Sequence, residues 1–295
     1  MPSILDDIKS SFRQGNILTR LIYINLAVFV VMNLVPSITY LFVRPGIHID
    51  QWFSLPSDLG ALLVKPWTLF TYMFLHVEFF HILFNLLWFY FIGRIFMDLL
   101  GERRLLSTYI LGGLVGGVFY VTAYNIFPSF EDVLPEAKAM GASASIMAII
   151  VGIATKVPNY SIRLIILGDI KLKYIAMVFV IMDLISMSKG NAGGRIAHLG
   201  GALFGYTYIK QLDKGRDWSI AFYHWVDIFK ALFTFKKSSK VKVVHRNASR
   251  KRSRQEQPRD DQISVDAILD KISKSGYDSL SKEEKDILFR ASQNK

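Results

Sequence analysis

The chain has 295 residues, a net charge of +11 and 52% hydrophobic residues, with a mean hydropathy of +0.31. This composition excludes an ordinary soluble domain, because the apolar residues are gathered into long runs. Cysteine is absent, which excludes disulfides, thiolate catalysis and cysteine metal sites together.

The apolar runs predict six transmembrane helices. The first follows Lys9, Arg13 and Arg20, is too long for a signal-peptide core and has no clean cleavage site, so we expect it to stay in the membrane. The fourth and sixth fall short of ~20 residues, which is tolerated where a helix is buried among others or lines a water-filled cavity. The predicted fold is an all-α polytopic membrane bundle. Its spans cover about residues 21–43, 79–98, 105–127, 141–156, 172–188 and 194–212.

Lysine and arginine are distributed unequally between the two sides of this bundle. The positive-inside rule predicts that both termini are cytoplasmic. The cytoplasmic connections then carry Arg94, Arg103, Arg104, Lys156, Arg163, Lys171 and Lys173. The opposite side carries Arg44, Lys65, Lys138, Lys189 and Arg195 beside Glu131, Asp132 and Glu136.

Two aromatic stretches lie outside the spans. The connection over residues 44–78 is long and contains Trp52 and Trp67, so we expect it to dip into the membrane interface. Residues 218–235 predict a helix on the inner leaflet, and a basic segment from Lys236 to Arg254 follows. We interpret that segment as a linker near anionic lipid rather than as a nucleic-acid site, because no aromatic platform accompanies it.

The C-terminal residues predict a small helical hairpin. Ser264 is expected to cap a first helix that ends at Gly276, and Ser281 with Glu284 forms a capping box for a second. It carries no catalytic constellation, and its partner is unknown. The predicted organisation is a cytoplasmic N-terminal segment (1–17), a six-span domain (18–212), an interfacial helix with a basic linker (213–262) and the hairpin (263–295).

A serine and a histidine are expected at one depth in the membrane. Span four runs inward and Ser143 lies thirteen residues before Lys156, which is roughly 20 Å at ~1.5 Å per residue. Span six also runs inward and His198 lies fourteen residues before Leu212, roughly 21 Å by the same rise. A hydroxyl and an imidazole level with one another indicate a nucleophile and a base, although His198 as a buried polar packing residue is the alternative.

Small residues recur at every fourth position on spans four and six, which lets two membrane helices pack closely. They are Ala144, Ala148 and Gly152 on span four, and Ala197, Gly201 and Gly205 on span six.

Span two adds His81 and Asn85, which share a helical face, and His76 precedes them. Donors there can stabilise an oxyanion beside Ser143, or they can simply bond between helices. For His76 both interpretations stay open, and for Asn85 we favour catalysis. A metal site is not expected, because no His-Glu-x-x-His run is present.

The segments HVEFFHILFN (76–85), GASAS (141–145) and AHLGGALFG (197–205) resemble the three signatures of rhomboid intramembrane serine proteases. Order and spacing agree over roughly residues 20–212. The resemblance implies a dyad in an outward-opening, water-filled cavity, with Ser143 as nucleophile and His198 as general base. It implies that His81, Asn85 and the Ser143 backbone N–H assist the oxyanion. No cofactor is expected, and His76 and Met147 are candidates for side chains that pack around the site.

The sequence departs from this family at three positions. Ala144 replaces the usual glycine after the serine, Met147 replaces an aromatic ring that stacks on the histidine, and Thr68 follows Trp67 where arginine is frequent. Asp183 could steer His198 as a third member. We favour an interfacial carboxylate that reaches water.

The predicted function is an intramembrane serine endopeptidase of the bacterial cytoplasmic membrane that cleaves transmembrane proteins near their outer boundary. The span five helix and the outer loop are expected to admit substrates laterally, by the resemblance. A catalytically silent rhomboid-like protein that binds client spans is the alternative. A small-solute transporter fits less well, because the halves show no internal repeat.

Overall fold

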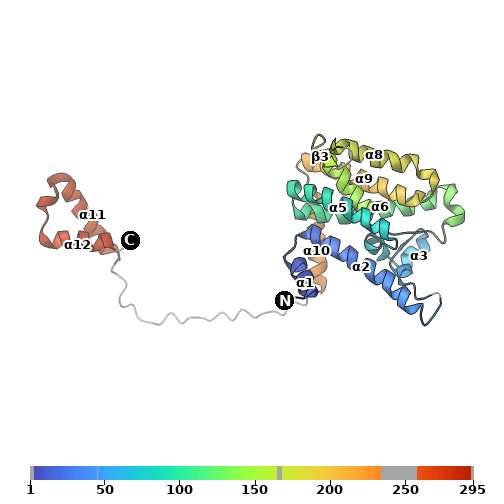
Figure 1. The fold of residues 1–295 in the computed structure, drawn as a ribbon. Helices are drawn as coiled ribbons and strands as arrows, with labels where there is room; N and C mark the ends of the chain where they lie inside the picture. Colours follow the sequence, from blue (N-terminus) through green and yellow to red (C-terminus); the bar gives the residue numbers. More distant parts are fainter. Residues whose placement is uncertain (1–2, 45, 165–167, 234–257, 294–295) are drawn as a thin grey trace. The chain divides into compact units, whose positions relative to one another are not determined.

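The computed structural model describes residues 3–44, 46–164, 168–233 and 258–293. The chain divides into two compact units, Met1–Phe235 and Lys236–Lys295. In the larger unit, α5, α6, α8 and α9 lie side by side in one helical bundle (Figure 1). The α-helices of this unit are α1 (Ile4–Gln14), α2 (Ile17–Thr39), α3 (Leu59–Val64), α4 (Thr68–Thr71), α5 (Phe79–Leu100), α6 (Glu102–Ile126), α7 (Ser143–Lys156), α8 (Leu172–Ile185), α9 (Ala192–Asp213) and α10 (Trp218–Phe233).

Six of these helices, α2 and α5 to α9, lie where the sequence predicts membrane spans. Among the described helices, α2, α5 and α6 are long and apolar enough to cross a membrane. Two predicted lengths were wrong. Helix α9 has 22 residues and is not short, whereas α8 has 14 residues and ends at Ile185, before the 3-10 turn η4 (Met187–Lys189).

Helix α7 occupies the centre of the bundle, packed against α6 and α9. Ten of its fourteen residues are buried. Glycines permit this approach, because a Cβ at Gly201 or Gly205 on α9 would overlap the carbonyl oxygen of Ala144 or Ala148 on α7. The predicted small-residue faces therefore meet backbone to backbone.

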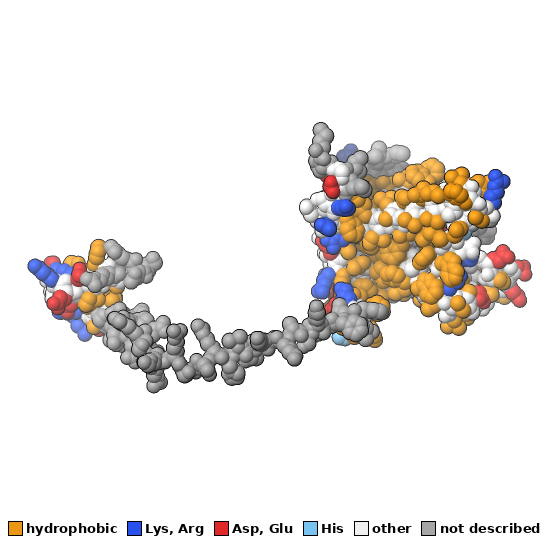
Figure 2. Space-filling view, turned by 90° about the horizontal axis from the view of Figure 1, so that it is seen from below, with side chains coloured by type: hydrophobic (Ala, Val, Ile, Leu, Met, Phe, Trp, Pro, Cys, Tyr) orange, Lys and Arg blue, Asp and Glu red, His pale blue; other side chains and the backbone are white. Residues whose placement is uncertain are grey.

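The outside of the bundle is apolar. Side chains such as Leu83, Val118 and Val178 are exposed on α5, α6 and α8. Figure 2 shows hydrophobic side chains over the middle of this unit, with charged ones toward its ends. An apolar exterior of this extent, on helices of spanning length, is that of a protein embedded in a bilayer.

The connection between α2 and α5 is folded. It contains η1 (Ile49–Trp52), β1 (Leu55–Pro56), α3, α4 and η2 (Tyr72–Phe74), and β1 pairs with β2 (Lys138–Ala139), which follows η3 (Pro128–Val133). Trp67 Nε1 donates to the Trp52 carbonyl at 2.8 Å, and the Thr68 hydroxyl donates to the Lys65 carbonyl at 2.6 Å. Thr68 thus closes a local turn at the position where the family often has arginine. The interfacial depth of this connection stays a prediction.

The all-α description needs one correction beyond that short pairing. Residues between α7 and α8 form an antiparallel hairpin of β3 (Ser161–Leu164) and β4 (Gly168–Lys171), in which Ser161 lies opposite Lys171. The sequence predicts only a basic connection there, because its charges interrupt the alternation by which strands are recognised.

Helix α10 confirms the predicted helix after the sixth span, and Asp217 ties it to the bundle. The Asp217 carboxylate accepts from Arg104 Nε, from the Tyr208 hydroxyl and from the Ser219 backbone N–H, each at 2.9 Å. Burial would raise the pKa of Asp217, but the hydrogen bonds from Ser219, Arg104 and Tyr208 outweigh it and hold this pKa below its ordinary value. The basic segment 236–254 lies outside the described residues.

The smaller unit contains α11 (Pro258–Ser275), η5 (Tyr277–Ser279) and α12 (Lys282–Gln293). Gly276 ends α11 with φ +77°, and Ser281 and Glu284 form the predicted capping box at 2.8 and 3.2 Å. The predicted cap at Ser264 was wrong, because α11 begins at Pro258, five residues before the expected boundary at 263. Proline suits a first helical turn, where its missing N–H has no partner to lose.

Candidate active site

The turn before α7 is held by two of its backbone N–H groups, which donate to a carbonyl in η2 and to a side chain just after η2. Gly141 has φ +126° and donates its N–H to the Tyr72 carbonyl at 2.9 Å. The next N–H, of Ala142, is donated to Nε2 of the fully buried His76 at 3.3 Å. Ser143 then opens α7. Of the two interpretations left open for His76, this contact matches the structural one: the ring holds the turn that presents the serine.

Of the two serines in GASAS, only Ser143 lines the cavity. Ser145 is fully buried, and its hydroxyl lies 4.0 Å from the Met73 sulfur. A helix turns by about 100° per residue, so residues two apart point to different sides. The helix start thus separates an accessible hydroxyl from a packed one.

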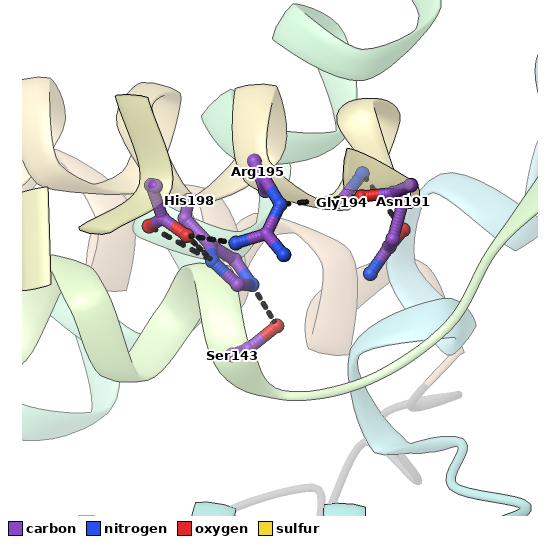
Figure 3. A network of polar contacts seen from close by, with 7 residues as sticks. Ser143, Asn191, Gly194, Arg195 and His198 are labelled. Atoms are coloured by element: carbon purple, nitrogen blue, oxygen red, sulfur yellow. Dashed lines mark hydrogen bonds and ion pairs between the residues drawn. The ribbon is translucent and has the colours of Figure 1, made fainter. Parts of the chain in front are cut away.

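His198 on α9 reaches the same level as Ser143. Its Nε2 lies 2.7 Å from Ser143 Oγ, a short hydrogen bond (Figure 3). The other ring nitrogen, Nδ1, faces a carboxylate and so carries the proton, which leaves Nε2 free to accept from the serine hydroxyl. Ser143 and His198, which helix rise placed at one depth, are therefore in contact.

The carboxylate is that of Asp183, and here the expectation of an interfacial group in water was wrong. Asp183 is only 7% exposed, and its two oxygens lie 3.1 and 3.0 Å from His198 Nδ1. Its position follows from α8, which ends two residues later and turns this side chain toward α9.

Arg195 completes the polar chain and was missed by the sequence reasoning. Its guanidinium NH1 lies 3.6 Å from Asp183 Oδ1, and its Nε donates to the Gly190 carbonyl at 3.3 Å. Arg195 lies one turn into α9, behind the cap in which Asn191, in a left-handed conformation, accepts from the Gly194 N–H at 3.2 Å (Figure 3). The available signal was its spacing: Arg195 and His198 are three apart and share a helical face.

His81 and Asn85 lie one turn apart on α5. The His81 and His76 rings meet edge to face at 5.1 Å. A Cβ on Gly141 would lie 2.9 Å from His81 Cε1, so only glycine leaves this ring its place. Asn85 is buried and donates to the His81 carbonyl one turn earlier, at 2.8 Å. Both side chains line the same cavity as Ser143.

The two departures inside the site are accommodated by packing. A Cβ at Gly116 on α6 would lie 2.5 Å from the Ala144 methyl, so the methyl after the serine fills space that Gly116 leaves empty. Met147 is buried and lines the cavity, where its flexible thioether replaces a ring.

The cavity in front of Ser143 has a volume of about 780 Å³. It is bounded by α5, α7, α8 and α9, with Trp88 and Phe179 meeting edge to face at 5.0 Å between α5 and α8. Within the described part of the chain, no three His, Cys, Asp or Glu side chains are grouped to hold a metal ion. The arrangement supplies a hydroxyl, a base and hydrogen-bond donors facing one space, which suits acyl transfer.

Comparison with known proteins gives this site a family. The Rhomboid domain model matches residues 64–212, half of the chain, and a family of unknown function (DUF6576) matches residues 247–294. Rhomboid protease GlpG from Salmonella newport (strain SL254), from Salmonella heidelberg (strain SL476) and from Salmonella typhi is 35% identical over 66 residues. That segment is 22% of this chain and 24% of each relative, so the chain covers about a quarter of their length. The chain is an integral membrane protein that belongs to the rhomboid family.

Proposed function

We propose that this protein is an intramembrane serine endopeptidase in which Ser143 is the nucleophile and His198 the general base. The observation that carries the proposal is the 2.7 Å contact between Ser143 Oγ and His198 Nε2 at the wall of the 780 Å³ cavity. A serine hydroxyl is a weak nucleophile until a neighbouring base accepts its proton.

The positions of these atoms support a two-stage acyl transfer. His198 Nε2 takes the hydroxyl proton while Oγ attacks the substrate carbonyl carbon, which forms a tetrahedral oxyanion. The imidazolium then gives the proton to the leaving amine, the C–N bond breaks and an acyl-enzyme remains. A water molecule then gives a proton to His198 Nε2 and attacks the acyl carbon. The bond to Ser143 Oγ breaks, Oγ takes the proton back from His198, and the carboxylic acid product leaves.

The oxyanion would be stabilised by the backbone N–H of Ser143, which opens α7, with His81 and Asn85 assisting. The first N–H groups of a helix have no partner within the helix and point toward its positive end. Donors fixed in place before the charge develops stabilise it without reorganisation, typically by ~3–4 kcal/mol each.

The proposed substrates are transmembrane proteins cut near the outer membrane boundary, at small residues. Rhomboid relatives carry protease in their name, and the cavity lies at the ends of α7 and α9 opposite the Lys156–Asp213 ion pair of 2.5 Å. With both termini cytoplasmic, that cavity faces outward. A substrate helix must unwind locally there, because its carbonyls are otherwise hydrogen-bonded within the helix.

Cleavage of a single-span reporter by the purified protein tests the proposal. Ser143→Ala and His198→Ala are expected to lose essentially all activity, whereas Ser129→Ala and His48→Ala change exposed residues and should cut like the parent. A serine-directed phosphonate should label the parent and fail on Ser143→Ala. Full cleavage by Ser143→Ala would exclude the assigned nucleophile. A parent that neither cuts nor is labelled would favour the silent binder.

A further inference from the structure

The geometry points to Asp183 as a positioning residue for His198, itself held by Arg195, so that the catalytic unit has four members in place of the two that the family resemblance implies. This inference rests on the proposed protease function. It concerns the partner of His198 Nδ1, the ring nitrogen that has no role in a Ser143–His198 dyad.

Asp183 is placed to accept from one atom of His198. Both carboxylate oxygens lie within 3.1 Å of Nδ1, closer than the 3.6 Å between Oδ1 and Arg195 NH1. An imidazole fixed at Nδ1 can neither flip its ring nor exchange tautomers, so Nε2 always faces Ser143 as the acceptor.

Burial of this carboxylate requires a positive charge nearby. Asp183 is nine-tenths buried, and a charge in such a place is costly unless it is paired. Arg195 supplies that charge at 3.6 Å, and its Nε is held by a hydrogen bond to the carbonyl of Gly190, two residues before α9 begins. Arg195 and His198 are on the same helix, so the backbone positions from which both groups reach the carboxylate are fixed relative to one another.

The proton path keeps Asp183 ionised. The serine proton moves to His198 Nε2, and the proton on Nδ1 stays there while the imidazolium exists. The carboxylate then faces a positive ring and stabilises it as the tetrahedral intermediate forms. No proton passes to Asp183, and the charge on Arg195 is unchanged throughout.

A purely structural role is the competing explanation, since the same contacts join α8 to α9. The two roles differ in what they predict. If the contact between Asp183 and His198 only joins α8 to α9, breaking it should lower the stability of the protein and its affinity for substrate. A positioning role lowers turnover on a folded protein with little change in KM.

Asp183→Asn is the direct test. The amide can donate to Nδ1 and so force the proton onto Nε2, the wrong tautomer. We expect kcat to fall at least ~100-fold, with KM within about twofold of the parent. The matched control is Asp169→Asn, the same change on an exposed strand residue, which should leave kcat unchanged.

Chemical rescue separates positioning from folding. In Asp183→Ala, added formate should restore part of the lost turnover, because it can occupy the space of the missing carboxylate, and it should not rescue His198→Ala. Arg195→Lys should retain more activity than Arg195→Gln, because it keeps the positive charge.

The outcomes separate this inference from the proposed function. If the parent cuts, Ser143→Ala is inactive and Asp183→Asn cuts like the parent, the inference fails and the dyad stands. A folded Asp183→Asn with raised KM, unchanged kcat and no formate rescue in Asp183→Ala would also overturn it. Activity in Ser143→Ala would instead refute the proposed function.

Discussion

Helices α8 and α9 carry the two partners of the hydrogen bond between Asp183 and His198. The two helices differ in how many contacts fix them in the bundle. Helix α9 meets α7 through Gly201 and Gly205, is capped by Asn191 and is tied at its other end by Tyr208 to Asp217. Helix α8 buries mainly its first turn and Asp183, and most of its other side chains are exposed. His198 is thus on the helix with more packing and capping contacts, while Asp183 is on the helix with fewer.

The largest effect on stability should come from disrupting the contact between α9 and α7. In Gly201→Leu the new side chain would overlap the backbone of Ala144, which cannot move aside without displacing α7. We expect a loss of more than about 3 kcal/mol in the free energy of unfolding and little folded protein. Thermal unfolding in detergent measures it. The control Gly60→Leu, on an exposed helix, should unfold near the parent temperature.

A substitution at Asp217 tests the hydrogen bonds that fix the C-terminal end of α9. Its folded pKa lies below the unfolded value, so its contribution is present above about pH 4 and is lost as pH falls through the folded pKa. Asp217→Asn should cost about 1–3 kcal/mol at pH 7. The difference in unfolding temperature between variant and parent should shrink on acidification from pH 7 to pH 3. A constant difference would show that the carboxylate charge is irrelevant to these hydrogen bonds.

Removing the contact between Phe179 and Trp88 tests how α8 is held against α5. Their rings close the space between α8 and α5 at the cavity wall. Phe179→Ala should cost about 1 kcal/mol or somewhat more, and should raise cleavage of a bulky single-span substrate if α8 limits access. Phe91→Ala removes an exposed ring of α5 and is the control. Lower stability with unchanged cleavage would mean that substrates reach Ser143 another way.

The smallest effect is expected on the outer face of α8. Val178 is 60% exposed, so Val178→Ala removes two methyl groups from a side chain that lies mostly outside the packed core. The free energy of unfolding should change by no more than about 0.5 kcal/mol. A loss above 1 kcal/mol in the same detergent would reveal that this face is covered in the folded protein.

The sequence predicts the parts of this site that depend on helix rise and small-residue spacing. Ser143 and His198 meet because both distances are counted along regular helices from the same membrane boundary. Asp183 was misplaced because its burial depends on where α8 ends and how it leans on α9, which hydropathy does not encode. Arg195 was counted only as a charge for topology. Its role depends on a tertiary partner that spacing alone does not reveal.

The close approach of α7 to glycines of α6 and α9 also predicts which positions can vary among related sequences. A Cβ at Gly112 on α6 would collide with the methyl group of Ala148, and its other neighbours are at ordinary distances. The methyl could therefore be carried by either residue, so glycine and alanine can exchange between these two positions across evolution. Gly205 faces a carbonyl oxygen, which no substitution at Ala148 removes. Among relatives, positions 112 and 148 should vary as a pair, whereas position 205 should remain glycine.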